Sequence, residues 1–145
     1  MGLPEAIGWW WIVKAIQFQS DSLVRLQSSV FNDSKLIQNA KERGSQLFER
    51  LSDIKDRSNI IGDNRGIGLL QGLEIVKDKK TKERFNPKKY VNMLLTEKLK
   101  QRGIWIRVPA YILPVAPPLT STKDQIDQIC DAIDSSLIEL EKEII

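Results

Sequence analysis

Histidine is absent from this sequence, and its absence narrows the chemistry that the chain can carry. Without imidazole there is no Ser–His or Cys–His nucleophile pair, no imidazole metal ligand and no histidine proton shuttle. The single cysteine, Cys130, lies at helical spacing between Ile126 and Ile133. We therefore expect it to be a core residue of a reduced, cytoplasmic protein. No catalytic, cofactor-binding or metal-ligating residue is assigned.

Three glycines, Gly66, Gly68 and Gly72, form a G-x-G-x-x-x-G pattern that invites comparison with a phosphate-binding loop. The pattern misses the dinucleotide fingerprint by one residue, and no helical pattern follows it to meet a pyrophosphate. The lysine of a P-loop is missing as well. We interpret these glycines as residues that permit a strand turn and close backbone packing.

The charged residues are interpreted as solvated surface. The carboxylate pairs Asp124 with Asp127 and Glu139 with Glu143 fall on the polar side of the last predicted helix. The segment "KDKKTKER", residues 77–84, carries five bases and two acids, so its charge of +3 equals the formal net charge of the whole chain. Because this basicity is local and not interleaved with aromatic residues, no nucleic-acid partner is expected.

The first predicted helix covers residues 34–56 or thereabouts, where apolar residues recur at helical spacing after the potential caps Asp33 and Ser34. Two strands are predicted in "NIIGDNRGIGLLQGLEIV", because glycines interrupt its apolar and β-branched runs. A tight turn is predicted between them at "DNRG", residues 63–66.

A second helix is predicted from the cap Asn86 and the following Pro87 to Gly103. Short strands are predicted at "IWIRV" and "YILPV", on either side of a proline. Thr122 and Gln125 form a capping box for a final helix. The residues of that helix expected to face the core are Ile126, Ile129, Cys130, Ile133, Leu137 and Leu140.

This order of elements predicts an α/β (α+β) two-layer sandwich, in which three helices cover one face of a small, mainly antiparallel sheet of four strands. Residues 34–145 are expected to form one domain, because no linker interrupts them.

Residues 1–33 do not fit the pattern and form an atypical, tryptophan-rich segment. Its apolar stretch "AIGWWWIV" is too short to span a bilayer and lacks the basic start of a secretory signal, so no membrane partner is expected. Three consecutive tryptophans, Trp9, Trp10 and Trp11, face different directions on any regular element. We expect them to lie at an interface, and we expect a homo-oligomer.

Four segments resemble, in order and spacing, the C-terminal small domain of class-III pyridoxal-phosphate-dependent aminotransferases. They are "NAKERGSQLFERL", "IIGDNRGIGLLQGLEIVKDKKTKERF", "GIWIRV" and "ILPVAPPLTSTKDQID". This is the family of the 4-aminobutyrate, ornithine and diaminopelargonate aminotransferases. The resemblance implies the small domain of a fold-type I enzyme, with a proline strap that closes the sheet beside the active-site mouth.

The resemblance also implies pyridoxal phosphate as cofactor and amino-group transfer from an amino acid or ω-amine to a 2-oxo acid. In this family the Schiff-base lysine and the phosphate cup belong to a large domain that has no counterpart in these residues. Every lysine here is predicted to be exposed, so the cofactor is not expected to bind this chain alone. Two possibilities stay open: a small domain that works with a separately encoded cofactor-binding domain, and a truncated orphan domain that serves as a structural or interaction module.

Substrate recognition follows from the resemblance only in part. Many family members hold the substrate carboxylate with an arginine two residues ahead of "APPL", but Pro114 stands at that position. The diaminopelargonate-type members use an arginine further upstream, and Arg107 matches it. Arg107 is therefore the candidate for the substrate carboxylate, but the favoured interpretation is a residue that ends a strand and makes a surface ion pair.

Overall fold

The structure is a computed structural model that describes residues 34–144, so the tryptophan-rich segment predicted at 1–33 lies outside the described residues. From Gln38 onward the chain forms one compact unit. Its elements are the helices α2 (Ser34–Arg57), α3 (Val91–Gln101) and α4 (Lys123–Ile144), the 3-10 helix η1 (Pro87–Lys89), and the strands β1 (Ile61–Ile67), β2 (Leu70–Ile75) and β3 (Ile112–Val115).

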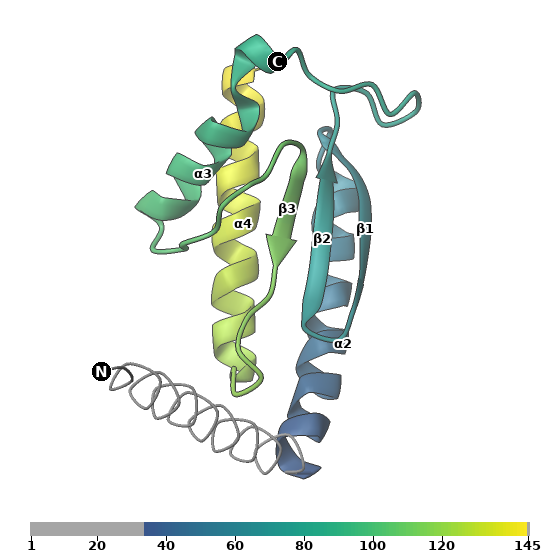
Figure 1. Cartoon of the computed structure of the whole chain (residues 1–145), viewed down its shortest axis with the longest axis vertical. Helices are drawn as coiled ribbons and strands as arrows, with labels where there is room; N and C mark the ends of the chain where they lie inside the picture. The colour runs from purple at the N-terminus through teal and green to yellow at the C-terminus, as the bar shows by residue number, and fades with distance from the viewer. Residues whose placement is uncertain (1–33, 145) are drawn as a thin grey trace, which may run out of the picture. The chain divides into compact units, whose positions relative to one another are not determined.

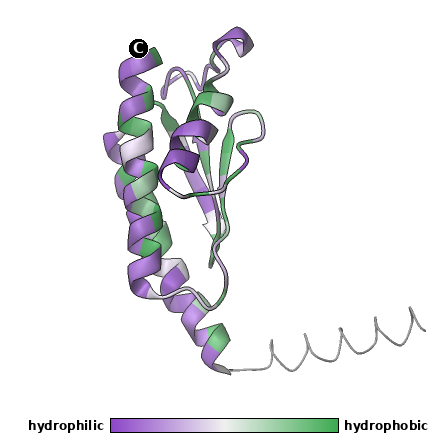
Figure 2. Cartoon of the chain, turned by 90° about the vertical axis from the view of Figure 1, so that its left-hand side faces the viewer, coloured by the Kyte–Doolittle hydropathy of each residue, from purple (hydrophilic) through white to green (hydrophobic). Residues whose placement is uncertain are grey.

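The three strands form one antiparallel sheet in the order β1-β2-β3, and the helices lie on one side of it. Helix α2 lies behind β1 and β2 in Figure 1, and the side view of Figure 2 places α4 on the same side of the sheet. Helix α3 packs on α4. The predicted α/β sandwich with an antiparallel sheet is thus confirmed, with three strands rather than four.

The core lies between the sheet and the helices, because each helix turns one apolar stripe inward. The predicted stripe of α4 is buried apart from Ile129, which is partly buried. Helix α2 contributes Leu47, Leu51 and Ile54, whereas Phe48, which belongs to the same run of apolar residues at helical spacing, is exposed.

The turn of the β1–β2 hairpin differs from the prediction. Strand β1 continues through "DNRG" to Ile67, and the chain reverses at Gly68 and Leu69, where Gly68 has a φ of 53°. Asn64 is held in the strand by its side chain, which donates to the carbonyl of Phe48 at 3.2 Å and to Ser52 Oγ at 3.0 Å. The turn propensity of "DNRG" is therefore overridden by contacts with α2, 16 and 12 residues away in sequence.

The strand predicted at "IWIRV" does not form. Residues 104–109 have no strand partner, although their side chains alternate between exposed and partly or fully buried. The amide of Ile75 donates to the carbonyl of Tyr111. In an antiparallel pair the hydrogen-bonded positions alternate, so the backbone nitrogen of Pro114, three residues after Tyr111, points away from β2 and toward the outer edge of the sheet. Proline has no N–H, and a fourth strand would lack a donor there.

The second predicted helix is divided. Asn86 caps it as predicted, accepting from Lys88 N at 3.0 Å, but η1 ends at Lys89. Tyr90, whose φ of 48° is left-handed, separates η1 from α3. This break turns Tyr90 outward, so it is 60% exposed instead of sharing the buried face of Val91, Leu95 and Leu99. Gly103, with a φ of 78°, follows the helix end.

The predicted capping box opens α4. Thr122 N donates to Gln125 Oε1 at 2.9 Å, and Gln125 N donates to Thr122 Oγ1 at 3.3 Å. Ahead of it, the proline strap (residues 116–121) is held on α2 by Asn39, whose side chain donates to Leu119 O at 2.7 Å and Ser121 O at 3.0 Å. No helix in residues 34–144 is both long and apolar enough to cross a membrane.

Candidate functional site

Arg107 lies in the extended segment of residues 104–109, which connects α3 to β3. Val108 is buried, while Ile104 and Ile106 pack partly against the core. This alternation leaves Trp105 and Arg107 exposed on the other side of the segment. The covered apolar residues on either side of Arg107 therefore place its side chain on the exposed side of the segment.

The neighbouring backbone is tied to the domain by side chains from other elements. Asn92 donates to the carbonyl of Val108 at 3.4 Å, and Tyr111 Oη donates to the carbonyl of Phe85 at 2.9 Å. The guanidinium of Arg84 covers the ring of Tyr111, 5.5 Å from its centroid. Arg107 therefore projects from a segment with fixed ends.

The surroundings of Arg107 suit a small anion. A shallow hollow of about 470 Å³ is lined by Lys100, Trp105 and Arg107, together with Glu97. Lys100 Nζ lies 5.4 Å from the centroid of the Trp105 ring. Within the described part of the chain, Arg107 makes no hydrogen bond or ion pair. A guanidinium without an internal partner keeps all its donors for a carboxylate.

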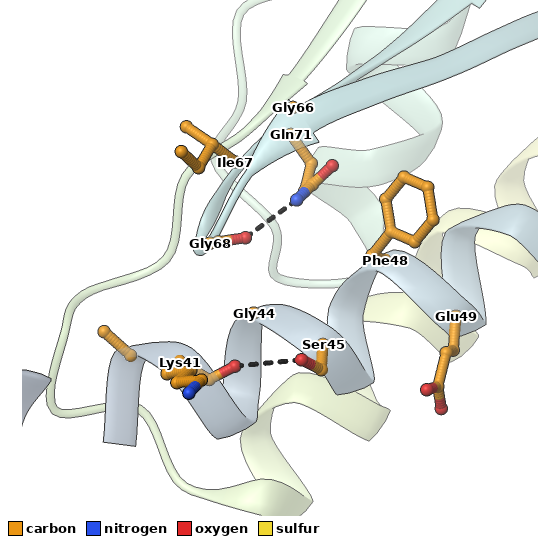
Figure 3. A pocket seen from close by; sticks show the side chains of 10 residues that line it. Lys41, Gly44, Ser45, Phe48, Glu49, Gly66, Ile67, Gly68 and Gln71 are labelled. Carbon is orange, nitrogen blue, oxygen red and sulfur yellow. Dashed lines mark hydrogen bonds between the residues drawn. The ribbon is translucent and has the colours of Figure 1, made fainter. Parts of the chain in front are cut away.

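Two of the predicted glycines, Gly66 and Gly68, line a second hollow of about 640 Å³ between α2 and the hairpin tip, together with Gly44 (Figure 3). A Cβ on Gly44 would lie 2.5 Å from Gly68 Cα, and a Cβ on Gly66 would lie 2.2 Å from Leu70 O. Gln71 is buried and donates through Nε2 to Gly68 O at 2.7 Å. The structure confirms close packing at Gly66 and a turn at Gly68, and a strand, not a helix, follows them. A Cβ at Gly72 would meet only ordinary contacts, so the prediction does not hold there.

Three of the described lysines, Lys55, Lys79 and Lys98, are partly buried and not exposed as predicted. Lys98 lies at the contact between α3 and α4. Its side chain is 12% exposed and lies between Glu143, at 2.8 Å, and Glu139, at 3.0 Å. The hydrogen bonds to Glu143 and Glu139 raise the pKa of Lys98. A Schiff-base lysine needs the opposite shift, so Lys98 is an ion-pair residue of the α3–α4 contact.

Lys79 also has a structural contact, donating from Nζ to the carbonyls of Lys55 at 2.7 Å and Ser58 at 2.9 Å. These carbonyls belong to the C-terminal end of α2, where a cation is favoured. The basic segment thus includes a helix cap as well as solvated residues.

Cys130 is buried, as predicted for a core residue. Burial raises the pKa of its thiol to about 11, so the thiol stays protonated at neutral pH. Within residues 34–144, no group of three or more Cys, Asp and Glu side chains is placed to hold a metal ion.

The described residues do not fit pyridoxal phosphate. The cofactor requires a lysine with a lowered pKa and a polar cup for its phosphate. Lys98 has a raised pKa, and the backbone at Gly66 and Gly68 is in close contact with Leu70 and Gly44. Arg107 and its hollow therefore remain the candidate site of this domain.

The model of the family described as aminotransferase class-III matches residues 22–137 of the chain. The chain belongs to the class-III aminotransferase family. The match begins twelve residues ahead of Ser34, the first residue of α2. Members of this family depend on pyridoxal phosphate, and solved structures similar to this chain include forms described as PLP-bound and PMP-bound.

Two curated relatives illustrate the match. The mitochondrial alanine–glyoxylate aminotransferase 2 homolog 2 of Arabidopsis thaliana is 35% identical over 115 residues, which are 77% of this chain and 24% of that relative. The adenosylmethionine-8-amino-7-oxononanoate aminotransferase of Methanocaldococcus jannaschii is 31% identical over 110 residues, 76% of this chain and 24% of that relative. The chain thus spans about a quarter of the length of the curated relatives it matches.

The same correspondence holds in three dimensions. A PMP-bound aminotransferase structure from Vibrio fluvialis is similar with a TM-score of 0.74 and 29% identity. The match covers 79% of this chain and 25% of that one. The fold of this class-III aminotransferase domain is therefore that of one part of a larger transaminase.

Sequence reasoning named Arg107 as a candidate, and this stays a prediction; it did not point to Lys100 and Trp105 in the same hollow. Lys100 lies in α3, and Trp105 follows the helix end at Gly103, so they meet only after the chain reverses there. A tryptophan two residues ahead of an arginine in an alternating segment is the signal that could have suggested a shared surface.

Proposed function

We propose that residues 34–145 act as the small domain of an aminotransferase that moves an amino group from an amino acid or ω-amine to a 2-oxo acid. In this proposal the Schiff-base lysine and the cofactor cup come from a cofactor-binding domain beyond these residues. The observation that carries it is the family match over residues 22–137, combined with a set of described lysines that does not fit the cofactor.

Arg107 is proposed to bind the carboxylate of the substrate. Its support is the exposed guanidinium, unpaired within the described residues, and the second cation, Lys100, in the same hollow. Bidentate Arg–carboxylate contacts fix orientation as well as charge, so a lysine in place of Arg107 is a poor substitute. Glu97, in the same hollow, disfavours dianionic ligands.

The direct test mixes the purified chain with pyridoxal phosphate, an amine donor and a 2-oxo acid. We expect no bound-cofactor absorbance in the visible range and no amino-acid product from the chain alone. Adding the PLP-loaded remainder of a relative, the Vibrio fluvialis aminotransferase without its matched quarter, is expected to give product. Turnover by the chain alone that is lost on changing one lysine would refute the proposal.

The role of Arg107 is tested in the same mixture. Arg107→Lys should raise the KM for a carboxylate-bearing substrate while leaving the KM for an amine without a carboxylate unchanged. An equal effect of the substitution on both substrates would assign Arg107 to the surface instead.

The protein is also proposed to be a cytoplasmic homo-oligomer. The buried, reduced Cys130 supports a cytoplasmic location. Sedimentation of the full chain tests self-association, and a clean monomer would contradict it.

A further inference from the structure

Strand β2 carries a glutamine at a position where its pattern places a core residue. Gln71, Leu73 and Ile75 alternate onto the face of the sheet that the helices cover, and all three are buried. Leu73 and Ile75 are apolar, whereas Gln71 is polar and only 4% exposed. A buried amide is costly unless its nitrogen and its oxygen both find hydrogen-bond partners. The partners of Gln71 therefore indicate whether it serves the fold alone.

Only the nitrogen of this amide has a partner. Nε2 of Gln71 donates to the carbonyl of Gly68 at 2.7 Å, which ties the side chain to the turn of the hairpin. Oε1 is buried and accepts no hydrogen bond from residues 34–144. A reversed amide would place Oε1 against the carbonyl oxygen of Gly68, so the oxygen is the end without a partner. The described residues thus leave one buried acceptor for a donor from elsewhere.

The unpaired acceptor belongs to the hollow between α2 and the hairpin tip. In Figure 3 the side chain of Gln71 extends from β2 and the ring of Phe48 extends from α2, so they form opposite walls. Ala40 and Ile67 add apolar surface to the lining. The volume of about 640 Å³ is in the range of small-molecule sites. Apolar walls with a single polar group are typical of a site that orients a small ligand.

Gly66 makes room for the oxygen of Gln71. A Cβ at Gly66 would lie 2.5 Å from Gln71 Oε1, which is closer than two non-bonded atoms approach. Any other residue at position 66 would therefore displace the amide or the strand. The glycine is thus part of the geometry that holds the acceptor in the hollow.

The charges around the hollow favour a neutral ligand. Lys41 and Glu49 contribute one cation and one anion to its lining, and the amide of Gln71 is neutral. Equal and opposite charges give no net attraction for an ion. The ring of Phe48 is 43% exposed, so it offers surface to a second ring. The chemistry of the lining therefore suits a neutral aromatic molecule that carries one hydrogen-bond donor.

We infer that this hollow is a binding site for a neutral, ring-bearing ligand with a hydroxyl or N–H group. The group donates to Gln71 Oε1, and the ring packs on Phe48. The ligand bridges α2 and the hairpin, because Phe48 belongs to the helix and Gln71 to β2. Arg107 is not part of this hollow, and the site does not depend on the proposed amino transfer.

The test compares phenol with toluene, which differ only in a hydroxyl in place of a methyl group. Each probe is titrated into the isotope-labelled full chain, and binding is followed by NMR at the side-chain amide signal of Gln71. That signal is identified by its loss in Gln71→Met. Phenol should bind about fivefold more tightly than toluene and should shift this signal, because only phenol donates to the free oxygen. Absence of saturable phenol binding, or equal affinity for the two probes, overturns the inference.

Two variants separate the acceptor from the hollow. Gln71→Met keeps the length of the side chain but removes the acceptor, so the preference for phenol should disappear while toluene still binds. Ser45→Phe changes an exposed residue that lines the hollow and fills the space from α2, so both probes should lose binding. Circular dichroism checks that each variant is folded.

Ile138→Phe is the matched control, because Ile138 is an exposed residue of α4 that does not line the hollow. It should leave the affinities for both probes unchanged. A preference for phenol that survives Gln71→Met would assign the hydroxyl to another partner, and phenol binding that survives Ser45→Phe would place the probe elsewhere. Either result overturns the inference.

Discussion

The two faces of the sheet are made by the same strands and have opposite environments. Along β2, Leu73 and Ile75 point toward the helices and are fully buried, while Leu70 and Glu74 point to the opposite face, which we call the open face. Both faces carry large apolar residues, but the helices of the described residues cover only one of the two faces. The difference teaches that apolar content alone does not identify a core, since an interface is built from the same residues.

The largest expected effect contrasts two leucines of β2. Leu73→Ala should lower the free energy of unfolding by about 2–5 kcal/mol, because it leaves a cavity against the helices. Leu70→Ala, on the open face, should change it by about 0.5 kcal/mol or less. Urea unfolding followed by circular dichroism measures both, and comparable losses would mean that the open face is packed in this chain.

A second contrast uses two glycines of the hairpin. Gly66→Ala should cost about 1–3 kcal/mol, since its Cβ would fall 2.2 Å from the carbonyl oxygen of Leu70 and the backbone must shift. Gly72→Ala should be tolerated within about 0.5 kcal/mol, because its Cβ meets only ordinary contacts. Thermal unfolding of the two variants distinguishes them, and a destabilised Gly72→Ala would contradict the ordinary contacts at this position.

The buried thiol of Cys130 predicts that the free energy of unfolding depends on pH. Burial raises the pKa of Cys130 from 9.0 to about 11, so the folded state favours the protonated thiol more than the unfolded state does. This contribution is fully present below pH 9 or so and is lost as the pH rises toward 11. Stability of the native chain should therefore fall more steeply over this interval than that of Cys130→Ala, and parallel curves would contradict the buried thiol.

The smallest effect is expected at the charged end of the open face. Glu74→Gln removes one partner of Arg65, which keeps Asp63 at 3.1 Å. Because Arg65 is exposed, the loss should be about 0.5 kcal/mol or less and should shrink further in salt. A double-mutant cycle with Arg65→Gln checks this, and a coupling that persists at high salt would show that this end is shielded from water.

Helix α2 and the start of helix α4 could be predicted from sequence because their determinants are local. The stripe of α4 depends on residues three or four apart, and the box of Thr122 and Gln125 spans a single turn. The limits of α2 were predicted to within a residue for the same reason. The family was identified from ordered motifs, which likewise need no spatial contact.

The sequence by itself therefore determined helices α2 and α4, most of the buried stripe of α4 and the membership of the aminotransferase family. Tertiary structure decided the rest, because contacts distant in sequence outweigh local propensity. Asn64 was predicted in a turn, but its hydrogen bonds to Phe48 and Ser52 of α2 place it in β1. Lys98 was predicted to be exposed, but its ion pairs with Glu139 and Glu143 of α4 partly bury it. Alternation along a strand can show that its two faces differ, but which face the helices cover is settled only when the chain folds back on itself.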